Sequence, residues 1–256
     1  MLYIVLLFVF LLLLLLVYMW SLANENNVIK HEIVFDELPN SFGTIRIFFI
    51  SDIHKRMVNN EVIEKTKGKV DLVIIGGDLA EKGVPFSRIE ANIKKLRGLA
   101  PCYFVWGNND YELDYHQLDA TLLSLGVKVL DNTAVLFESN TGDKLSLLGV
   151  DYYNHQRDRL DLALSDSDPT AFKILASHCP RIVKKIKEEH QISLVLSGHT
   201  HGGQIRIFGL GRYKKGGIVK KGRTVVLTSN GYGTSLVPFR LGAKSETHLI
   251  NISSSK

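Results

Sequence analysis

Five apolar runs in this chain stop abruptly at a polar residue. They cover residues 44–51, 70–77, 101–106, 171–177 and 192–198. Short apolar runs rich in β-branched and aromatic side chains are typical of strands that are buried on both faces. Segments that mix polar and apolar residues lie between them and predict helices over 57–68, 85–98, 114–125 and 180–190. Strands that alternate with helices predict a layered α/β domain.

The first twenty residues, MLYIVLLFVFLLLLLLVYMW, carry no charged side chain. As a helix they are long enough to cross a hydrocarbon core of roughly 30 Å, and Tyr18 and Trp20 stand where interfacial aromatic residues are common. We therefore predict a single-pass anchor over residues 1–23 and a location at the cell membrane. The alternative is a cleaved signal peptide ending at the small residues Ser21 and Ala23, but it lacks a basic start and its apolar run is long.

The anchor is followed by a polar stretch with a β-rich end, so we expect a linker with an incoming strand over 24–40 and the main domain over 41–256. Lys30 is the only basic residue close to the apolar run, which is too little to decide which side of the membrane the domain occupies.

Composition changes this picture little. The chain has 256 residues, of which 45% are apolar and 22% charged, and a net charge of +5, which excludes a disordered chain. Part of the positive charge lies in the segment GRYKKGGIVKKGR, residues 211–223, which is either a solvated connection or a contact for an anionic substrate or lipid. Cys102 and Cys179 are the only cysteines and form no disulfide framework.

Polar residues at the ends of the predicted strands form an ordered set. The set comprises Asp52, His54, Asp78, Asn108, His178, His199 and His201. Ligands of α/β sheets bind beyond the carboxyl ends of the strands, so we expect these side chains to share one site. The chain also contains two controls. Asp114-x-His116 repeats the spacing of Asp52-x-His54 without a preceding strand, and we interpret it as a chance match on a helix surface. Gly142-Asp143 repeats Gly77-Asp78, but it lies in the evident turn SNTGDK.

This set offers carboxylate and amide oxygens together with four imidazoles. Such a mixture suits borderline divalent ions, namely Mn²⁺, Fe, Zn²⁺ or Co²⁺, better than Ca²⁺. Seven ligands are too many for one ion, whereas two ions roughly 3.5–4 Å apart, bridged by one carboxylate, would use them all. In the His-x-His segment each imidazole would reach a different ion. A hydroxide held between two cations attacks phosphoryl groups, which predicts hydrolysis of phosphate esters or anhydrides.

Five sequence blocks, SDIH, GGDLAEKG, GNND, SHCP and SGHTHGGQ, occur in this order over residues 51–204. They resemble the signature blocks of the calcineurin-like metallophosphoesterase superfamily. The tail SNGYGTSLVPFRLGAKSETHLI resembles the branch that carries an N-terminal membrane segment and includes proteins similar to UDP-2,3-diacylglucosamine pyrophosphatase.

The resemblance implies a fold and a set of roles. The fold is a four-layer α/β/β/α sandwich. One metal ion would be held by Asp52, His54 and His201 and the other by Asn108, His178 and His199, with Asp78 as the bridge. Asp78, Asn108 and His178 are expected to be catalytic as well. The expected substrates are phosphodiesters or lipid-linked pyrophosphates, and nucleic acid is not an expected partner.

One position departs from the family pattern. The third block commonly has a histidine that protonates the leaving group, and here that position is Asn109, which cannot transfer a proton. Tyr111, Glu112 and His155 are the candidates to replace it. We therefore expect a preference for diesters or anhydrides with good leaving groups. Two alternatives stay open: a metal-binding scaffold with weak turnover, and a nucleotide phosphodiesterase or nuclease.

Three further residues near the blocks have expected roles. Asp110 should cap the helix or turn after the third block. Arg240 should form an ion pair with Glu246 rather than bind a phosphate, and Gln204 should shape its loop or reach a substrate oxygen.

Overall fold

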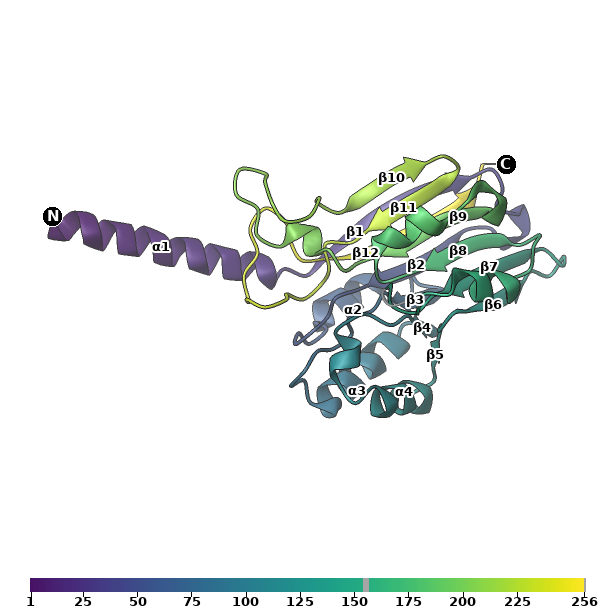
Figure 1. Ribbon diagram of the computed structural model, residues 1–256, viewed down its shortest axis with the longest axis horizontal. Coiled ribbons are helices and arrows are strands. Elements are labelled where there is room, and N and C mark those ends of the chain that lie inside the picture. The colour runs from purple at the N-terminus through teal and green to yellow at the C-terminus, as the bar shows by residue number, and fades with distance from the viewer. Residues whose placement is uncertain (154–156, 256) are drawn as a thin grey trace.

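The computed structural model describes residues 1–153 and 157–255, which form two six-stranded sheets packed face to face (Figure 1). In spatial order, the strands of the first sheet are β1 (Asn27–Phe35), β12 (Glu246–Ser254), β2 (Ile45–Ile50), β3 (Leu72–Ile75), β4 (Cys102–Phe104) and β5 (Val127–Val129). Those of the second are β10 (Gly217–Lys221), β11 (Thr224–Thr228), β9 (Ile192–Ser197), β8 (Phe172–Ala176), β7 (Lys144–Gly149) and β6 (Thr133–Glu138).

The α-helices lie outside the sheets or extend from the domain. They are α1 (Leu2–Ala23), α2 (Asn60–Thr66), α3 (Phe86–Arg97), α4 (Tyr115–Ser124) and α5 (Leu160–Ser165). Figure 1 shows α2, α3 and α4 together on the first sheet, while α1 projects away from the domain. This arrangement confirms the predicted four-layer α/β/β/α sandwich.

Alternating side chains of the central strands explain the layers. Ile47 and Phe49 of β2 belong to the same buried cluster as Ile174 of β8 and Leu196 of β9, which fills the space between the sheets. Phe48, one position along, packs instead with the helices on the outer face. Successive residues of a strand point to opposite faces, and here both faces are covered. That is why these strands are visible in the sequence as unbroken apolar runs.

The direction of the strands gathers the predicted polar ends at one edge. β2, β3 and β4 are parallel to one another in the first sheet, and β8, β9 and β11 are parallel in the second. The loops that follow their carboxyl ends therefore converge from both sheets.

Residues 180–190 differ from the prediction of one helix. The segment forms two 3₁₀ helices, η3 (Pro180–Lys185) and η4 (Glu188–His190). Pro180 begins η3, and the apolar residues of the segment contact the second sheet through Ile182, which is fully buried. Short tight turns of this kind are sufficient to cover the sheet, and a regular α-helix is not needed.

The helix α1 is the one helix within the described residues that is long and apolar enough to cross a membrane, by length and composition. Its side chains are exposed except near the end, where Met19, Leu22 and Ala23 are buried against the domain. There the backbone N–H of Arg240 donates to the carbonyl oxygen of Met19 at 3.0 Å. The last turn of α1 is thus packed directly onto the domain.

Candidate metal centre

The candidate ligands occupy an unusual backbone conformation. Asp52, His54, Asp78, His199 and His201 have φ values of 55°, 53°, 51°, 70° and 49°. Left-handed backbone is uncommon for residues other than glycine and costs about 1–3 kcal/mol at each position. Such strain persists where the surrounding structure enforces it, and it is concentrated at functional sites. The occurrence of left-handed backbone at five of the seven predicted ligands indicates that the fold holds these side chains in a required orientation.

Asp52, His54 and His201 form the first cluster. The Nε2 atoms of His54 and His201 lie 3.1 Å apart, and Nε2 of His201 lies 3.4 Å from Oδ1 of Asp52. All three side chains are buried. Their ligand atoms lie within 4.8 Å of one another, close enough to hold one metal ion.

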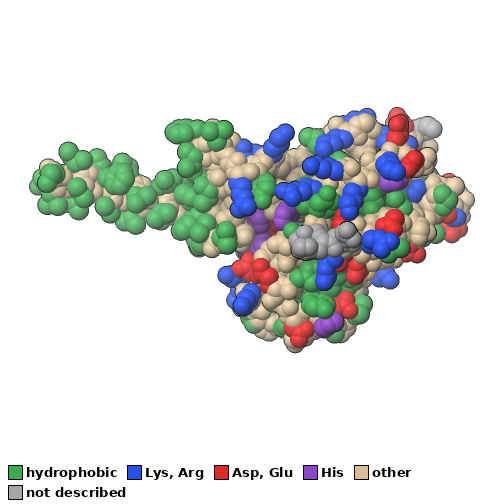
Figure 2. Space-filling view, viewed as in Figure 1, with side chains coloured by type: hydrophobic (Ala, Val, Ile, Leu, Met, Phe, Trp, Pro, Cys, Tyr) green, Lys and Arg blue, Asp and Glu red, His purple; other side chains and the backbone are tan. Residues whose placement is uncertain are grey.

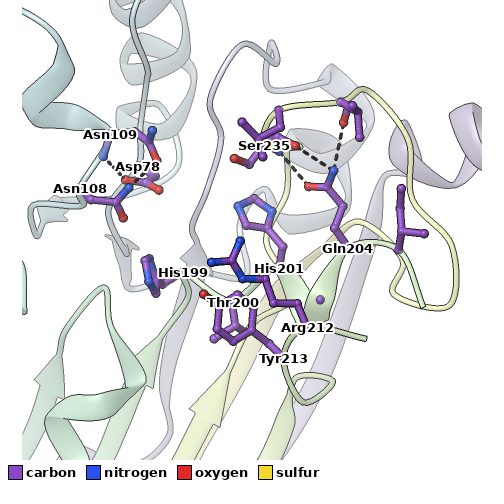
Figure 3. A pocket seen from close by; sticks show the side chains of 14 residues that line it. Asp78, Asn108, Asn109, His199, Thr200, His201, Gln204, Arg212, Tyr213 and Ser235 are labelled. Carbon is purple, nitrogen blue, oxygen red and sulfur yellow. Dashed lines mark hydrogen bonds between the residues drawn. The ribbon is translucent and has the colours of Figure 1, made fainter. Parts of the chain in front are cut away.

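Asp78, His178 and His199 form the second cluster, which also has its ligand atoms within 4.8 Å of one another. Nε2 of His178 lies 3.2 Å from Oδ2 of Asp78 and 3.1 Å from Nδ1 of His199. Asn108 lines the same pocket as Asp78 and His199. The structure thus divides six of the predicted residues into two groups of three, and Figure 3 shows the seventh, Asn108, beside Asp78.

Asp78 lies between the two clusters. Its Oδ2 atom is 3.2 Å from Nε2 of His178 in its own cluster and 3.7 Å from Nε2 of His54 in the other. Burial opposes ionisation of this carboxyl, but the His178 charge and hydrogen bond hold its pKa well below the usual range. The side chain is therefore a buried carboxylate with one oxygen facing both groups.

The residues fit divalent cations. Two pairs of imidazole nitrogens face each other at 3.1 Å, and each pair stands beside a buried carboxylate. The Oδ1 atom of Asn108 is buried without a hydrogen-bond partner among the described residues, although buried polar atoms are nearly always paired. Nitrogen and oxygen donors in this combination match borderline ions.

Burial sets the charge of two imidazoles. It lowers the pKa of His201 to about 3 and that of His199 to about 4, so both rings are neutral near pH 7 and have a free lone pair. For His178 burial acts in the same direction, but the Asp78 carboxylate outweighs it and raises the pKa to about 10. The Asp78 carboxylate, whose Oδ2 lies 3.2 Å from Nε2 of His178, thus stabilises the protonated form of this imidazole.

Neighbouring groups orient the candidate ligands. The Ser51 hydroxyl donates to Oδ2 of Asp52 at 2.6 Å, and Nδ1 of His178 lies 2.8 Å from the carbonyl oxygen of Gly76. Oε2 of Glu81 lies 2.8 Å from Nδ1 of His54. Such partners fix the ring orientation of a metal-binding histidine. Glu81 was not among the predicted site residues, although its position three residues after Asp78 was a usable signal.

Asp110 is not a helix cap, so that prediction was wrong. Its buried carboxyl accepts hydrogen bonds from the backbone N–H groups of Asp78, Ala80 and Gly107 at 2.8, 3.2 and 2.8 Å. Burial, with the Asp78 charge nearby, raises its pKa to about 7. The side chain ties the loop after β3 to the loop after β4, and so holds Asp78 in place.

Arg240 also differs from its prediction. Its guanidinium is fully buried and donates to the carbonyl oxygens of Asn230, Gly233 and Ala243 at 2.7, 2.6 and 3.2 Å. Glu246, the expected partner, instead accepts from the backbone N–H of Asn230. Arg240 lies against the imidazole of His201, with Nη2 3.2 Å from Nδ1. It is a structural support behind the first cluster.

A cavity of about 360 Å³ opens over the two clusters. Asn108, Asn109 and Asp78 line one side, and Arg212 and Tyr213 line the other; Figure 3 shows the Arg212 side chain reaching between His199 and His201. Gln204 shapes its loop, as predicted. As Figure 3 also shows, its amide is engaged with the backbone of Ser235 and Val237.

Two of the three candidates to replace a leaving-group acid can be placed. Glu112 accepts a hydrogen bond from Nδ2 of Asn109 at 2.8 Å. The Tyr111 hydroxyl donates to Asp151 at 2.6 Å, and burial raises its pKa, so this proton is engaged elsewhere. His155 lies outside the described residues.

The sequence controls behave as predicted. Asp114 caps α4 by accepting from the backbone N–H of Gln117, and His116 is exposed on the helix surface. Cys102 and Cys179 are buried free thiols.

Comparison with known proteins gives a consistent result. The model of the calcineurin-like phosphoesterase family matches residues 45–203. The uncharacterized protein YpbG of Bacillus subtilis (strain 168) is 44% identical over 238 residues, covering 91% of this chain and 90% of that protein.

A zebrafish (Danio rerio) relative, a transmembrane protein with metallophosphoesterase domain, is 30% identical over 250 residues. That match covers 88% of this chain but 56% of the relative, so the chain spans little more than half of it. Among solved structures, the phosphopantetheinyl hydrolase PptH from Mycobacterium tuberculosis superposes with a TM-score of 0.50 at 13% identity, over 74% of this chain and 90% of that one. This likeness concerns the fold.

Proposed function

The chain belongs to the calcineurin-like phosphoesterase family, and from this premise we propose that it is a membrane-anchored, two-metal phosphohydrolase. Its favoured substrates are phosphodiesters and lipid-linked pyrophosphates. The first ion is held by Asp52, His54 and His201, and the second by Asn108, His178 and His199.

One observation carries the two-metal proposal. Oδ2 of Asp78 faces both clusters, at 3.2 Å from His178 and 3.7 Å from His54. A carboxylate in this place can serve two cations at once. A single-ion site would leave one complete set of three ligands unused.

When bound, two such ions supply a nucleophile from water at neutral pH and offset the negative charge of the phosphoryl group. The chain itself does the positioning. Glu81, Ser51 and Gly76 fix the orientation of the metal-binding side chains. Arg212 lies opposite Asn109 in the pocket and is suited to bind a phosphoryl oxygen.

Metal-dependent turnover is the expected result for the purified full chain in detergent. A chromogenic nitrophenyl phosphodiester should be hydrolysed with a saturable dependence on Mn²⁺, with about two ions bound per chain. Colorimetric rates and metal analysis of the same samples measure both quantities. Metal binding without turnover would contradict the proposed enzymatic activity and favour the metal-binding scaffold as the alternative.

Asn109 predicts a leaving-group preference. Since an amide cannot donate a proton, we expect nitrophenyl esters to be cleaved much faster than alkyl esters. Asn109→His should raise alkyl-ester turnover by about 10²-fold and leave nitrophenyl turnover nearly unchanged, because Glu112 is placed to orient the new imidazole. Asn109→Gln is the matched control. Equal rates on alkyl phosphomonoesters and activated diesters in the unmodified protein would refute this idea.

The membrane part of the proposal rests on α1. The helix has 22 residues, which at about 1.5 Å per residue gives roughly 33 Å, and its mean hydropathy is 3.1 over the most apolar stretch. The zebrafish relative is named as a transmembrane protein, which supports the same role. We propose that α1 crosses the cell membrane once and holds the domain at its surface.

A further inference from the structure

Two loops beside the pocket carry exposed apolar side chains. In the 205–213 loop these are Ile207, Phe208 and Leu210, and in the 235–238 loop they are Leu236 and Val237; we call the five residues the apolar rim. Phe208 is 100% exposed, Leu236 97% and Leu210 79%. Large apolar groups gathered in this way usually mark an interaction surface.

The tips of both loops are also strained. Phe208 has a φ of 50° and Leu236 a φ of 63°. Bulky residues with left-handed backbone are genuine outliers. At each tip the structure thus combines an unfavourable backbone with a side chain that makes almost no contact with the rest of the domain. Backbone strain of this kind is concentrated at functional sites, which points to a contact outside the domain.

The two loops form one rigid unit. The Gln204 amide donates to the carbonyl oxygens of Ser235 and Val237 at 2.9 and 3.0 Å and accepts from the N–H of Ser235 at 2.9 Å. Inside the first loop the Arg206 guanidinium donates to the carbonyl oxygens of Gly202, Gly209 and Tyr213. The rim therefore keeps its position relative to the pocket.

The rim is also fixed relative to α1. Arg240 and Ser245 donate from their backbone N–H groups to the carbonyl oxygens of Met19 and Leu22. After the helix, Arg56 binds the carbonyl oxygens of Asn24 and Glu25 at 2.6 and 3.0 Å. Only residues 24–26 separate the end of α1 from the start of β1. Figure 1 shows both loops at the end of the domain where α1 joins it.

A bilayer around α1 would therefore meet the rim. The helix is about as long as the hydrocarbon core is thick, so its last turn lies at the membrane surface. In Figure 2 apolar side chains continue from the helix onto the adjacent end of the domain. The exposed Lys214 and Lys215 follow the apolar tip along the chain and complement anionic headgroups.

We propose that the apolar rim inserts into the bilayer that holds α1, as a second membrane contact, and that the metal pocket opens into the headgroup layer. The inference rests on the membrane role proposed for α1. Leu236, Val237 and Ile205 line the same cavity as His199 and His201. The cavity thus joins an apolar entrance to the metal-binding side chains. Its substrate class is an amphiphile that remains in the bilayer while its phosphate ester reaches the pocket.

The test uses the full chain reconstituted in vesicles of equal parts phosphatidylcholine and phosphatidylglycerol, with bromine near the top of the acyl chains as a fluorescence quencher. The native tryptophans are Trp20, at the end of α1, and Trp106, which is buried in the domain. Phe208→Trp and Leu236→Trp each add one reporter at the rim. Leu123→Trp is the matched control, because Leu123 is a 56% exposed leucine of α4, away from α1 in Figure 1.

The expected result is that bromine quenches Trp20 in every sample and quenches about half or more of the added signal at positions 208 and 236, as for side chains roughly 5–10 Å below the surface. The signal added at position 123 should not change. Quenching of Trp20 without quenching at 208 and 236 would overturn the rim contact and leave the anchor intact. Absence of quenching at Trp20 as well would overturn both.

A second measurement tests the consequence for the substrate. Phe208→Ser combined with Leu210→Ser changes rim residues that do not line the cavity. It should lower hydrolysis of a phosphodiester lipid in the same vesicles roughly tenfold, since two large apolar contacts are lost. Turnover of a water-soluble nitrophenyl diester should be unchanged, as should both activities of Leu123→Ser. Equal losses on both substrates would contradict entry from the bilayer.

Discussion

Replacing Asp78 with asparagine is expected to lower metal-dependent phosphodiester turnover at least about 10³-fold, a loss of roughly 4 kcal/mol of transition-state stabilisation. The shape of the side chain is nearly conserved. The substitution removes the negative charge, however, and an amide offers only one oxygen. Because Oδ2 of Asp78 faces His178 and His54, the substitution should weaken binding at both clusters. Rates at saturating Mn²⁺ and bound metal per chain measure the effect.

The chain supplies a matched control for this substitution. Asp143 also follows a glycine, but it lies in the turn between β6 and β7, where it accepts hydrogen bonds from Ser41 and Thr141. Asp143→Asn should retain turnover and metal content. Near-normal turnover of Asp78→Asn with full metal content would show that the bridging role is wrong, and circular dichroism would verify that both variants are folded.

Arg240→Met should have the largest effect on stability. The substitution leaves the buried carbonyl oxygens of Asn230, Gly233 and Ala243 without the Arg240 donor, and each unpaired group costs about 1–3 kcal/mol. We expect a loss of about 3–5 kcal/mol, which for a chain of this size corresponds to a decrease of roughly 10–15 °C in Tm. Thermal unfolding of the full chain in detergent measures it.

Arg223 provides the comparison for Arg240. It lies next to β11, partly exposed, with Nη2 3.3 Å from Glu37, and exposed ion pairs contribute little. Arg223→Met should therefore change Tm by no more than about 2 °C. If Arg240→Met were equally mild, the network around the buried guanidinium would not support the loop after β11.

The ends of the strands could be predicted from the sequence because the features that mark them, an apolar run followed by a polar residue, are local. Asp52, Asp78 and His199 follow strands that are covered on both faces, and such strands leave unbroken apolar runs in the sequence. Each run ends where the backbone leaves the sheet. The polar residue at that point was visible without knowledge of the partner strand, and the parallel direction of the strands then brings the ends together.

Other features depend on contacts that no local pattern carries. Arg240 was assigned to Glu246 because opposite charges suggest a pair, but its partners are backbone carbonyl oxygens, which every residue has. The binding of Asp110 to backbone N–H groups of another loop was missed for the same reason, because such groups also occur in every residue except proline. No local pattern marks Phe208 and Leu236 as exposed, and only the three-dimensional arrangement shows that they are.

The position of β12 bears on how the protein is made. It pairs with β1 along residues 27–35 and with β2 on its other side, so it occupies the gap between two strands that are synthesised far earlier. Translation must pass residue 254 before that gap can close. Until then β2 is paired only with β3, so the strand that leads into the loop of Asp52 and His54 is held from one side alone. The predicted metal-binding side chains of this loop would therefore reach their final places only after the ribosome has finished this strand.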